Sequence, residues 1–408
     1  MEDDLQDPEQ QTLPLKFGNF YLFDLIGKGG MAEVFLAKSY TSIGVERLCA
    51  IKRILPFLSA DGNFSNLFIQ EAKLAAKLRN ANIVQVLDLG RIDDQLYIAM
   101  EYVEGFDLNE LLGLCTRHKV MLPFEFAFFI IRETLRSLDY AHRSSDDDGS
   151  LLGVIHMDLS PSNVLISTEG EIKLCDFGIA RAVLSEEESA SCPEEAIQGK
   201  FAYMSPEQVR GHEVDQRSDV FSAGILLWEL LSGKRLYKCS DMDETYAKAM
   251  KAEIPELANR SIPEFDKTRD IVNRALEVNP DDRFQSAYEF LREIDDYIHQ
   301  ARMLPSQMRF ADFLMDNFGD DLIAKRRERE RALARVIPEA GEEPPDTEDS
   351  VTEVEPVEST GAEKKKDTEL SAEDAIRDLN RKLSIYAGIG ASMLLTIIAL
   401  IIIIYFTN

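Results

Sequence analysis

The spacing of apolar residues along the chain changes from a strand-like period to a helical one. From Phe17 to about residue 103, aromatic and aliphatic residues alternate in short runs typical of half-buried strands. Within this region, residues 66–78 instead place apolar residues at helical spacing. From Asp107 to about Ile298 the helical period dominates. We therefore predict an α+β protein with a smaller strand-rich part followed by a larger helical part.

The segments around this region differ from it in composition. Residues 1–16 are acidic and polar, and residues 336–384 form an acidic linker, so we expect both segments to be disordered. Residues 299–335 are predicted to be a helical extension. Its first part, residues 310–318, is amphipathic and suited to docking on the helical part. Its last turns, residues 325–335, mix Lys, Arg and Glu, which is more typical of a solvated helix face than of a lipid or nucleic-acid site.

The run Ile385–Phe406 is apolar and contains no charged residue. As a helix rising about 1.5 Å per residue it would be about 33 Å long, enough to span a hydrocarbon core of about 30 Å. The alternative, a buried core helix, is disfavoured because the run follows an acidic linker. Arg377, Arg381 and Lys382 precede the run. The positive-inside rule therefore predicts a single-pass membrane protein whose larger, N-terminal part lies in the cytoplasm.

Small residues within this run bear on whether the chain forms a homodimer. Gly388 and Ser392 stand four positions apart, as do Ala387 and Ala391. This spacing lets two membrane helices approach closely, and a homodimer is one interpretation. Small residues are also common in membrane helices that do not associate, which is the other interpretation.

Charge and cysteine content exclude several classes of function. The 408 residues carry a formal net charge of −28, which argues against a general nucleic-acid binder. No apolar run opens the chain, so we expect no cleavable signal peptide. The cysteines show no paired spacing and indicate reduced thiols rather than disulfides or a zinc site. They are Cys49, Cys115, Cys175, Cys192 and Cys239.

The richest candidate chemistry lies in the stretch V-I-H-M-D-L-S-P-S-N-V-L-I, residues 154–166. Two apolar runs bracket a polar loop that contains Asp158 and Asn163, and Pro161 between them makes the loop rigid. A second loop, Asp176-Phe177-Gly178, follows the apolar stretch E-I-K-L-C. Together these loops offer a carboxylate that could orient a hydroxyl and two oxygen ligands for Mg²⁺. Phosphoryl transfer needs these groups.

Two features nearer the N-terminus fit the same chemistry. The glycine-rich stretch from Gly27 to Val34 lies between two predicted strands, so its backbone N–H groups could close over phosphates. By itself this motif is more often a hairpin turn, and a dinucleotide-binding loop is disfavoured because a strand follows it. Lys52 lies in an apolar strand, where an unpaired charge would be costly. Glu71, on the predicted helix, is a candidate partner.

In their order, these motifs resemble those of the protein kinases, and Y-M-S-P-E-Q resembles the bacterial Ser/Thr kinases of eukaryotic type. The resemblance covers residues 17–298 and implies a bilobal kinase fold that binds ATP with Mg²⁺ (or Mn²⁺). It implies that Asp158 orients the accepting hydroxyl, that Asn163 and Asp176 hold the metal, and that Lys52, paired with Glu71, holds the phosphates. The implied nucleotide-binding residues are Ile26, Gly27, Lys28, Gly29, Gly30, Val34, Ala50, Lys52, Glu71, Met100, Glu101, Val103 and Leu165.

The resemblance also implies two supporting contacts in the helical part. Glu207, in S-P-E, would pair with Arg283, in N-P-D-D-R-F, to lock this part together. Asp219 would brace the catalytic loop from a buried helix.

The chain departs from the family pattern at several positions. Ala32 replaces the third glycine of the loop, and Met157 replaces the Arg that usually receives an activating phosphate. We therefore predict that activation does not require Ser185, Ser189 or Ser191. Their replacement by Ala should leave most of the activity intact.

Ser160 and Lys200 look exchanged relative to the family, which has Lys at the first position and Thr at the second. We expect Lys200 to supply the positive charge at the transferring phosphoryl group, with Ser160 as its hydroxyl partner. The alternative is that Lys200 is a solvated loop residue and that Ser160 marks loss of activity.

The sequence thus predicts a membrane-tethered Ser/Thr protein kinase acting on protein substrates in bacterial signalling. The main alternative is a membrane-anchored pseudokinase scaffold, which Met157 and Ser160 favour and the intact metal and phosphate ligands oppose. A small-molecule kinase is a second alternative, disfavoured by Y-M-S-P-E, which is the peptide-platform motif of the family.

Overall fold

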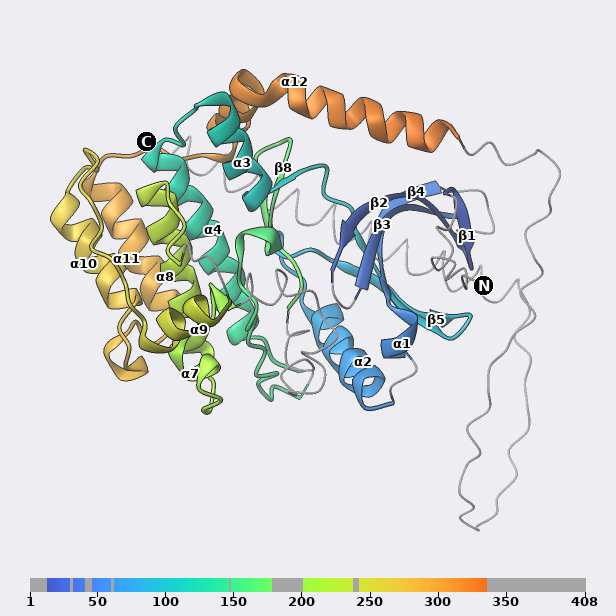
Figure 1. The fold of residues 1–408 in the computed structure, drawn as a ribbon, viewed down its shortest axis with the longest axis horizontal. Helices are drawn as coiled ribbons and strands as arrows, with labels where there is room; N and C mark the ends of the chain where they lie inside the picture. The colour runs from blue at the N-terminus through green and yellow to red at the C-terminus, as the bar shows by residue number, and fades with distance from the viewer. Residues whose placement is uncertain are drawn as a thin grey trace, which may run out of the picture. The chain divides into compact units, whose positions relative to one another are not determined.

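The computed structural model describes residues 13–29, 32–40, 46–59, 62–146, 148–177, 201–237 and 242–335. In Figure 1 these residues form a strand-rich part and a helical part. We call residues 13–100 the N-lobe, residues 101–104 the hinge and residues 105–300 the C-lobe. This arrangement confirms the predicted α+β, two-lobed fold.

An antiparallel sheet of six strands, ordered β1-β2-β3-β4-β6-β5, forms most of the N-lobe. Alternation of side chains places Leu22 and Ile51 in a cluster on one face, and Ile54 and Ile98 on the other, against Phe68 of the helix α2. The elements are β1 (Leu15–Phe17), β2 (Phe20–Lys28), β3 (Ala32–Tyr40), β4 (Glu46–Ile54), α1 (Pro56–Ser59), α2 (Gly62–Lys77), β5 (Val86–Ile92) and β6 (Gln95–Glu101).

The C-lobe is built around α8 (Gln216–Ser232), in which every residue from Ser218 to Ser232 is buried. A helix that is apolar on all sides needs neighbours on all sides, and α4, α10 and α11 pack against it. The remaining helices are α3 (Leu108–His118), α4 (Phe124–His142), η1 (Pro161–Asn163), α7 (Pro206–Val209), α9 (Met242–Lys251), α10 (Phe265–Ala275), η3 (Pro280–Asp282) and α11 (Ala287–Gln300).

A small sheet of three strands brings the two candidate catalytic loops together. Its strands are β7 (Gly105–Asp107), β8 (Val164–Ser167) and β9 (Ile172–Leu174), in the order β7-β8-β9. Asn163 directly precedes β8 and Asp176 follows β9 by two residues. Because β8 and β9 are antiparallel neighbours, the loop before one and the loop after the other lie at the same end of the hairpin.

The helical extension forms α12 (Gln307–Ala334), which has non-helical backbone angles at Phe318, next to Gly319. Apolar side chains four residues apart, at Phe310, Leu314, Phe318 and Leu322, are buried in the core cluster of the C-lobe. This confirms that the amphipathic part of the extension docks on the C-lobe. Ser306 caps the helix by accepting a hydrogen bond from the Arg309 N–H at 3.3 Å.

The predicted N-terminal tail, the acidic linker and the apolar run Ile385–Phe406 lie largely or wholly outside the described residues. Within the part of the chain that the structure describes, no helix is both long enough and apolar enough to cross a membrane.

Candidate active site

The backbone of the candidate catalytic loop is held by the carboxylate of Asp219, which is fully buried in α8. The N–H groups of His156 and Met157 donate to this carboxylate at 2.8 and 2.9 Å, and His142 Nε2 lies 2.7 Å from it. Burial raises the pKa of a carboxyl, but the contacts with His142 and His156 outweigh burial and lower the pKa of Asp219. Asp219 therefore braces the loop as a buried anion, which confirms the expected role.

His156 connects the two candidate catalytic loops. Its Nδ1 accepts the Asp158 N–H at 3.2 Å, so the proton of the neutral ring resides on Nε2, which donates to the Cys175 carbonyl at 2.9 Å. Cys175 directly precedes Asp176, and the ring of Phe177 packs 4.6 Å from the His156 ring. The buried imidazole thus holds Asp158 and Asp176 in fixed relation.

The candidate metal ligands lie close to the candidate catalytic carboxylate. Asn163 Nδ2 donates to the Asp158 carbonyl at 2.7 Å and lies 3.4 Å from its carboxylate. Because the amide nitrogen is used in this way, the amide oxygen is the atom that Asn163 offers to a cation. With the Asp176 carboxylate it makes a hard oxygen donor set that suits Mg²⁺ or Mn²⁺.

Protein groups alone do not complete a metal site among the described residues, where no cluster of three or more His, Cys, Asp or Glu could hold a cation. Mg²⁺ usually takes one or two carboxylates and completes its shell with phosphate oxygens and water. Asn163 and Asp176 fit a cation that arrives with a nucleotide.

Two residues of the site have strained backbones. Met157 and Asp176 have φ angles of 63° and 61°, in the left-handed region that non-glycine residues seldom adopt. Each such angle costs on the order of 1 kcal/mol or more, and it persists only where surrounding contacts fix it. At Met157, the contacts that fix the backbone are visible: Asp219 accepts its N–H, and Gln208 Nε2 donates to its carbonyl at 2.9 Å.

Lys52 approaches the same place from the N-lobe. Its Nζ lies 2.8 Å from Asp176 Oδ1, and its side chain is 11% exposed. A mostly buried ammonium needs a counter-charge, as the position of Lys52 in an apolar strand indicated, and Asp176 supplies it. The side chain of Glu71, the expected partner, is not among those described, so the Lys52–Glu71 pair stays a prediction.

The register of the N-lobe sheet gathers the predicted nucleotide-binding residues on one face. Val34 pairs with Gly27 on one side and with Lys52 on the other, and Ala50 pairs with Met100. Positions 50 and 52 are two residues apart, so their side chains lie on the same face of the sheet. These pairs place Val34, Ala50 and Met100, the expected walls of the pocket, beside Lys52.

The other predicted nucleotide-binding residues lie near the glycine turn, in the hinge and in β8. Ile26 is 45% exposed at the end of β2, and the Gly29 N–H donates to the Ala32 carbonyl across the glycine turn at 2.9 Å. Lys28 Nζ lies 3.7 Å from Glu33. In the hinge, Glu101 pairs with Lys173 at 2.9 Å, and Val103 follows two residues later. Leu165 lies in β8, between Asp107 of β7 and Lys173 of β9.

Two predicted site residues, Gly30 and Lys200, lie outside the described residues. Ser160 is described, and its Oγ lies 3.0 Å from Ser162 Oγ. The predicted contact between Ser160 and Lys200 is therefore untested.

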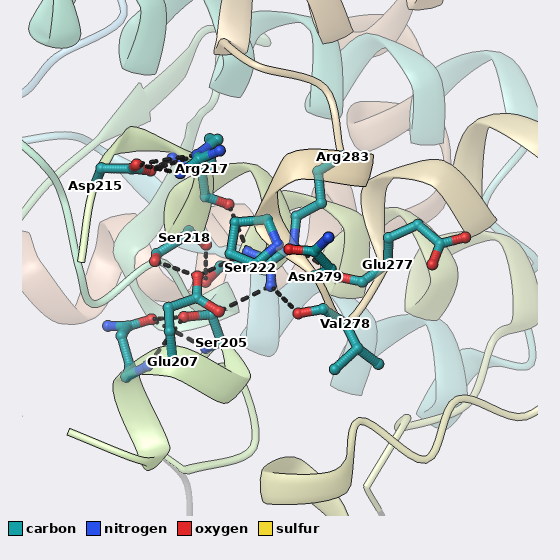
Figure 2. A network of polar contacts seen from close by, with 12 residues as sticks. Ser205, Glu207, Asp215, Arg217, Ser218, Ser222, Glu277, Val278, Asn279 and Arg283 are labelled. Carbon is teal, nitrogen blue, oxygen red and sulfur yellow. Dashed lines mark hydrogen bonds and ion pairs between the residues drawn. The ribbon is translucent and has the colours of Figure 1, made fainter. Parts of the chain in front are cut away.

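A buried ion pair between Glu207 of α7 and Arg283, the residue after η3, joins two segments of the C-lobe. Both terminal nitrogens of Arg283 bond the Glu207 carboxylate, at 2.7 and 2.8 Å, and Ser218 Oγ donates to Glu207 at 2.5 Å (Figure 2). Burial would raise the pKa of Glu207, but these hydrogen bonds outweigh it and hold the pKa at about 2. This confirms the pair predicted from S-P-E and N-P-D-D-R-F.

Sequence reasoning missed the role of Gln208, the residue after Glu207. Its Oε1 accepts the Ser205 N–H at 3.0 Å in a capping box at the start of α7, and its Nε2 donates to the Met157 carbonyl. Ser205 and Gln208 show the S-x-x-Q spacing of a capping box, so the first contact was readable from the sequence. The second contact joins segments 51 positions apart, and no local signal indicates it.

A family model described as the protein kinase domain matches residues 20–298. The chain belongs to the protein kinase family. The match covers most of the chain and contains both candidate catalytic loops, the glycine-rich turn, the buried ion pair and Asp219. Residues 299–335, which contain the whole of α12, lie beyond it.

Curated bacterial kinases are similar to this chain over the same region. It is 33% identical over 331 residues to the tyrosine-protein kinase MasK of Myxococcus xanthus, a match that covers 78% of this chain and 50% of the relative. It is 33% identical over 279 residues to the serine/threonine-protein kinase PrkC of Bacillus subtilis, covering 68% of this chain and 40% of the relative. The chain thus spans half or less of the length of these relatives.

Among solved structures, the kinase domain of Mycobacterium tuberculosis PknI is similar to this one. The two chains are 28% identical, with a TM-score of 0.53, and the match covers 70% of this chain and 98% of the PknI chain. The match thus takes in nearly all of that kinase domain and more than two thirds of this chain.

The low pKa of Glu207 predicts how stability depends on pH. Its ordinary pKa is 4.5 and its folded pKa is about 2, so its ionisation stabilises the fold fully above about pH 4.5 and progressively less as the pH falls toward 2. Glu207→Gln leaves Arg283 buried without a counter-charge and should lower the free energy of unfolding at pH 7 by about 3–5 kcal/mol. Denaturant titrations at several pH values measure both effects.

The matched control is Glu293→Gln, which removes a half-exposed carboxylate 3.4 Å from Lys267. An exposed pair contributes about 1 kcal/mol or less. Equal losses of stability in Glu207→Gln and Glu293→Gln at pH 7 would show that the Glu207–Arg283 pair does not lock the C-lobe. So would a parallel loss of stability in Glu207→Gln and wild type from pH 5 to pH 2.

Proposed function

We propose that this chain is a Ser/Thr protein kinase that transfers the γ-phosphate of ATP to hydroxyl groups of other proteins. The observation that carries the proposal is the convergence of Asp158, Asn163, Lys52 and Asp176 on one place, with the loops that hold them fixed by Asp219 and His156. Phosphoryl transfer requires positioning and charge stabilisation more than covalent catalysis, and these residues offer both.

Each residue has a role in this reaction. The oxygen of the accepting hydroxyl forms a bond to the γ-phosphorus as the bond from that phosphorus to the bridging oxygen of ADP breaks, and Asp158 accepts the hydroxyl proton. Lys52 holds the phosphates, and Asn163 and Asp176 bind the divalent cation, which neutralises the charge on the phosphate oxygens. The glycine turn from Gly27 to Gly30 covers the nucleotide.

The pseudokinase alternative rests on Met157 and Ser160. The contacts of Met157 weaken this alternative, because its backbone is fixed by Asp219 and Gln208 without an arginine side chain or a phosphate. We infer that the loop is assembled without phosphorylation of Ser185, Ser189 or Ser191, all of which lie outside the described residues.

The reaction is tested by incubating the purified full chain with labelled ATP and Mg²⁺ and analysing which amino acids become labelled. Wild type should label itself or a generic protein substrate on Ser and Thr. Asp158→Asn, Lys52→Ala and Asp176→Ala should each lower the rate by about 10²-fold or more, because they remove the group that accepts the hydroxyl proton, the cation that holds the phosphates and a ligand of the metal, respectively.

Circular dichroism should show that all three variants remain folded. Label on tyrosine alone would replace the Ser/Thr proposal with the activity for which the Myxococcus relative is named. Equal labelling by wild type and all three variants, or none by wild type, would favour the pseudokinase scaffold.

We further propose that Lys200 and Ser160 have exchanged the roles that the family gives to these positions. Lys200→Thr alone should lower the rate by about 10²-fold, the size expected on losing one electrostatic contact to the transferring group. Ser160→Lys combined with Lys200→Thr should recover much of the rate. The rates of both variants decide the matter, and a double mutant no faster than the single mutant would contradict the exchange.

We also propose that Ile385–Phe406 anchors the kinase in a membrane, with the catalytic part in the cytoplasm. The support is the sequence: an uncharged apolar run preceded by Arg377, Arg381 and Lys382. Removing residues 385–408 should move the protein from the membrane pellet to the supernatant on ultracentrifugation. A full chain that already stays in the supernatant would contradict the anchor.

A further inference from the structure

The second half of α12 makes a set of ionic contacts with the hinge that its mixed charge did not indicate. We call residues 319–334 the strap. Arg329 Nη1 lies 2.7 Å from one carboxylate oxygen of Glu104, and Arg326 Nε donates to the other oxygen at 2.8 Å. Lys325 Nζ donates to the Gly105 carbonyl at 3.1 Å and to Glu110 at 2.6 Å. These contacts span the junction between hinge and C-lobe.

Arg329 is the centre of this set. Its side chain is 15% exposed, whereas that of Arg326 is 52% exposed. Its guanidinium lies 6.0 Å from the ring centre of Tyr102 and forms a hydrogen bond with the Tyr102 hydroxyl. Burial raises the pKa of Tyr102, and Arg329 opposes this rise. The strap thus bonds two of the four hinge residues.

The strap also reaches the N-lobe. The helix α12 contacts β2, the strand that leads into the glycine turn. In Figure 1 the second half of α12 runs from the C-lobe toward that strand. Ala332, one turn beyond Arg329, is buried. One helix therefore contacts the hinge, the strand β2 beside the proposed nucleotide site, and the C-lobe.

The first half of α12 fixes where the strap begins. Phe310 and Phe318 are fully buried in the C-lobe, and Arg309 pairs with Glu125 at 3.0 Å. Gly170, in the turn between β8 and β9, has a φ of 76° and lies so close to the Gln307 carbonyl that a Cβ there would approach it to 2.4 Å. The helix is thus seated on the hairpin that carries both catalytic loops.

We propose that the strap is a positioning element of the kinase: Arg329, through Glu104 and Tyr102, holds the hinge in the geometry that binds the adenine of ATP. The proposal deepens the function proposed above and rests on its nucleotide site. The hinge supplies its backbone to the nucleotide, and a hinge residue that shifts by a fraction of an ångström loses those hydrogen bonds. An element bonded to the outer side of the hinge limits such shifts.

The helix α12 lies outside the kinase family model but partly inside the match to one relative. The kinase family model ends at residue 298, before α12 begins. The match to the Myxococcus kinase covers 78% of the 408 residues, so it must extend to about residue 318 or beyond, into α12. The extension is therefore shared, at least in its first half, with one relative.

The test measures the dissociation constant of ADP for the purified full chain by calorimetry, and KM and kcat for ATP. Arg329→Gln and Glu104→Gln should each weaken ADP binding and raise the KM for ATP by about 3- to 10-fold, with kcat within about twofold of wild type. Because the two side chains share one ion pair, the double variant should weaken binding by less than the product of the two single effects.

Arg327→Gln is the matched control, since Arg327 is exposed on the same helix and has no polar contact with any described residue. It should leave ADP binding unchanged. A second readout is hydrogen exchange of the backbone amides of residues 102–107 without nucleotide, which should speed up in Arg329→Gln and not in the control.

The outcomes separate this inference from the proposed function. If wild type transfers no phosphate but Arg329→Gln still weakens ADP binding, the kinase activity fails and the strap stands. If wild type is active and Arg329→Gln lowers the melting temperature without changing ADP binding or KM, the helix is only structural and the strap is overturned. Additive effects in the double variant would also overturn it, and a wild type that binds no ADP would overturn both.

Discussion

The candidate active site depends on a carboxylate that is buried where no water can solvate it. A buried charge is costly unless hydrogen bonds satisfy it, and Asp219 has its donors in the N–H groups of His156 and Met157 and in His142. The same hydrogen bonds also constrain the loop. Because α8 is packed on all sides, the N–H groups of the loop must come to Asp219, and this fixes the loop in one conformation that includes the left-handed backbone of Met157. The strain at Met157 is offset by bonds that exist only in this geometry.

From this anchor a chain of contacts leads to the rest of the site. His156 donates to the carbonyl of Cys175 and so fixes the backbone next to Asp176. Asp176 in turn pairs with Lys52 of the N-lobe. On the other side, Gln208 of α7 donates to the Met157 carbonyl. Its neighbour Glu207 is bound to the buried Arg283.

Much of this could be predicted from the sequence because it is carried by local pattern and by motif order. Alternating residues indicated the N-lobe strands, and the resemblance gave both the Glu207–Arg283 pair and the bracing role of Asp219. The contact of Gln208 with Met157 could not be predicted, since it depends on two segments that only the folded chain brings together. The strap was missed for a different reason. Glutamates are interspersed among Lys325, Arg326 and Arg329. A helix with this mixed charge has the same sequence pattern whether its side chains face solvent or pair with another element.

The break at Phe318 explains how one helix can serve both lobes. Glycine at position 319 weakens the helix there, and the departure from helical angles lets the two halves follow different surfaces. The first half is held by apolar burial at Phe310 and Leu314, which salt scarcely affects. The strap is held by ion pairs at partly exposed side chains, which salt and competing anions weaken. The division gives a fixed anchor on the C-lobe and an adjustable contact on the hinge. Added salt should therefore weaken the contact of the strap with the hinge before it affects the apolar contact of the first half with the C-lobe.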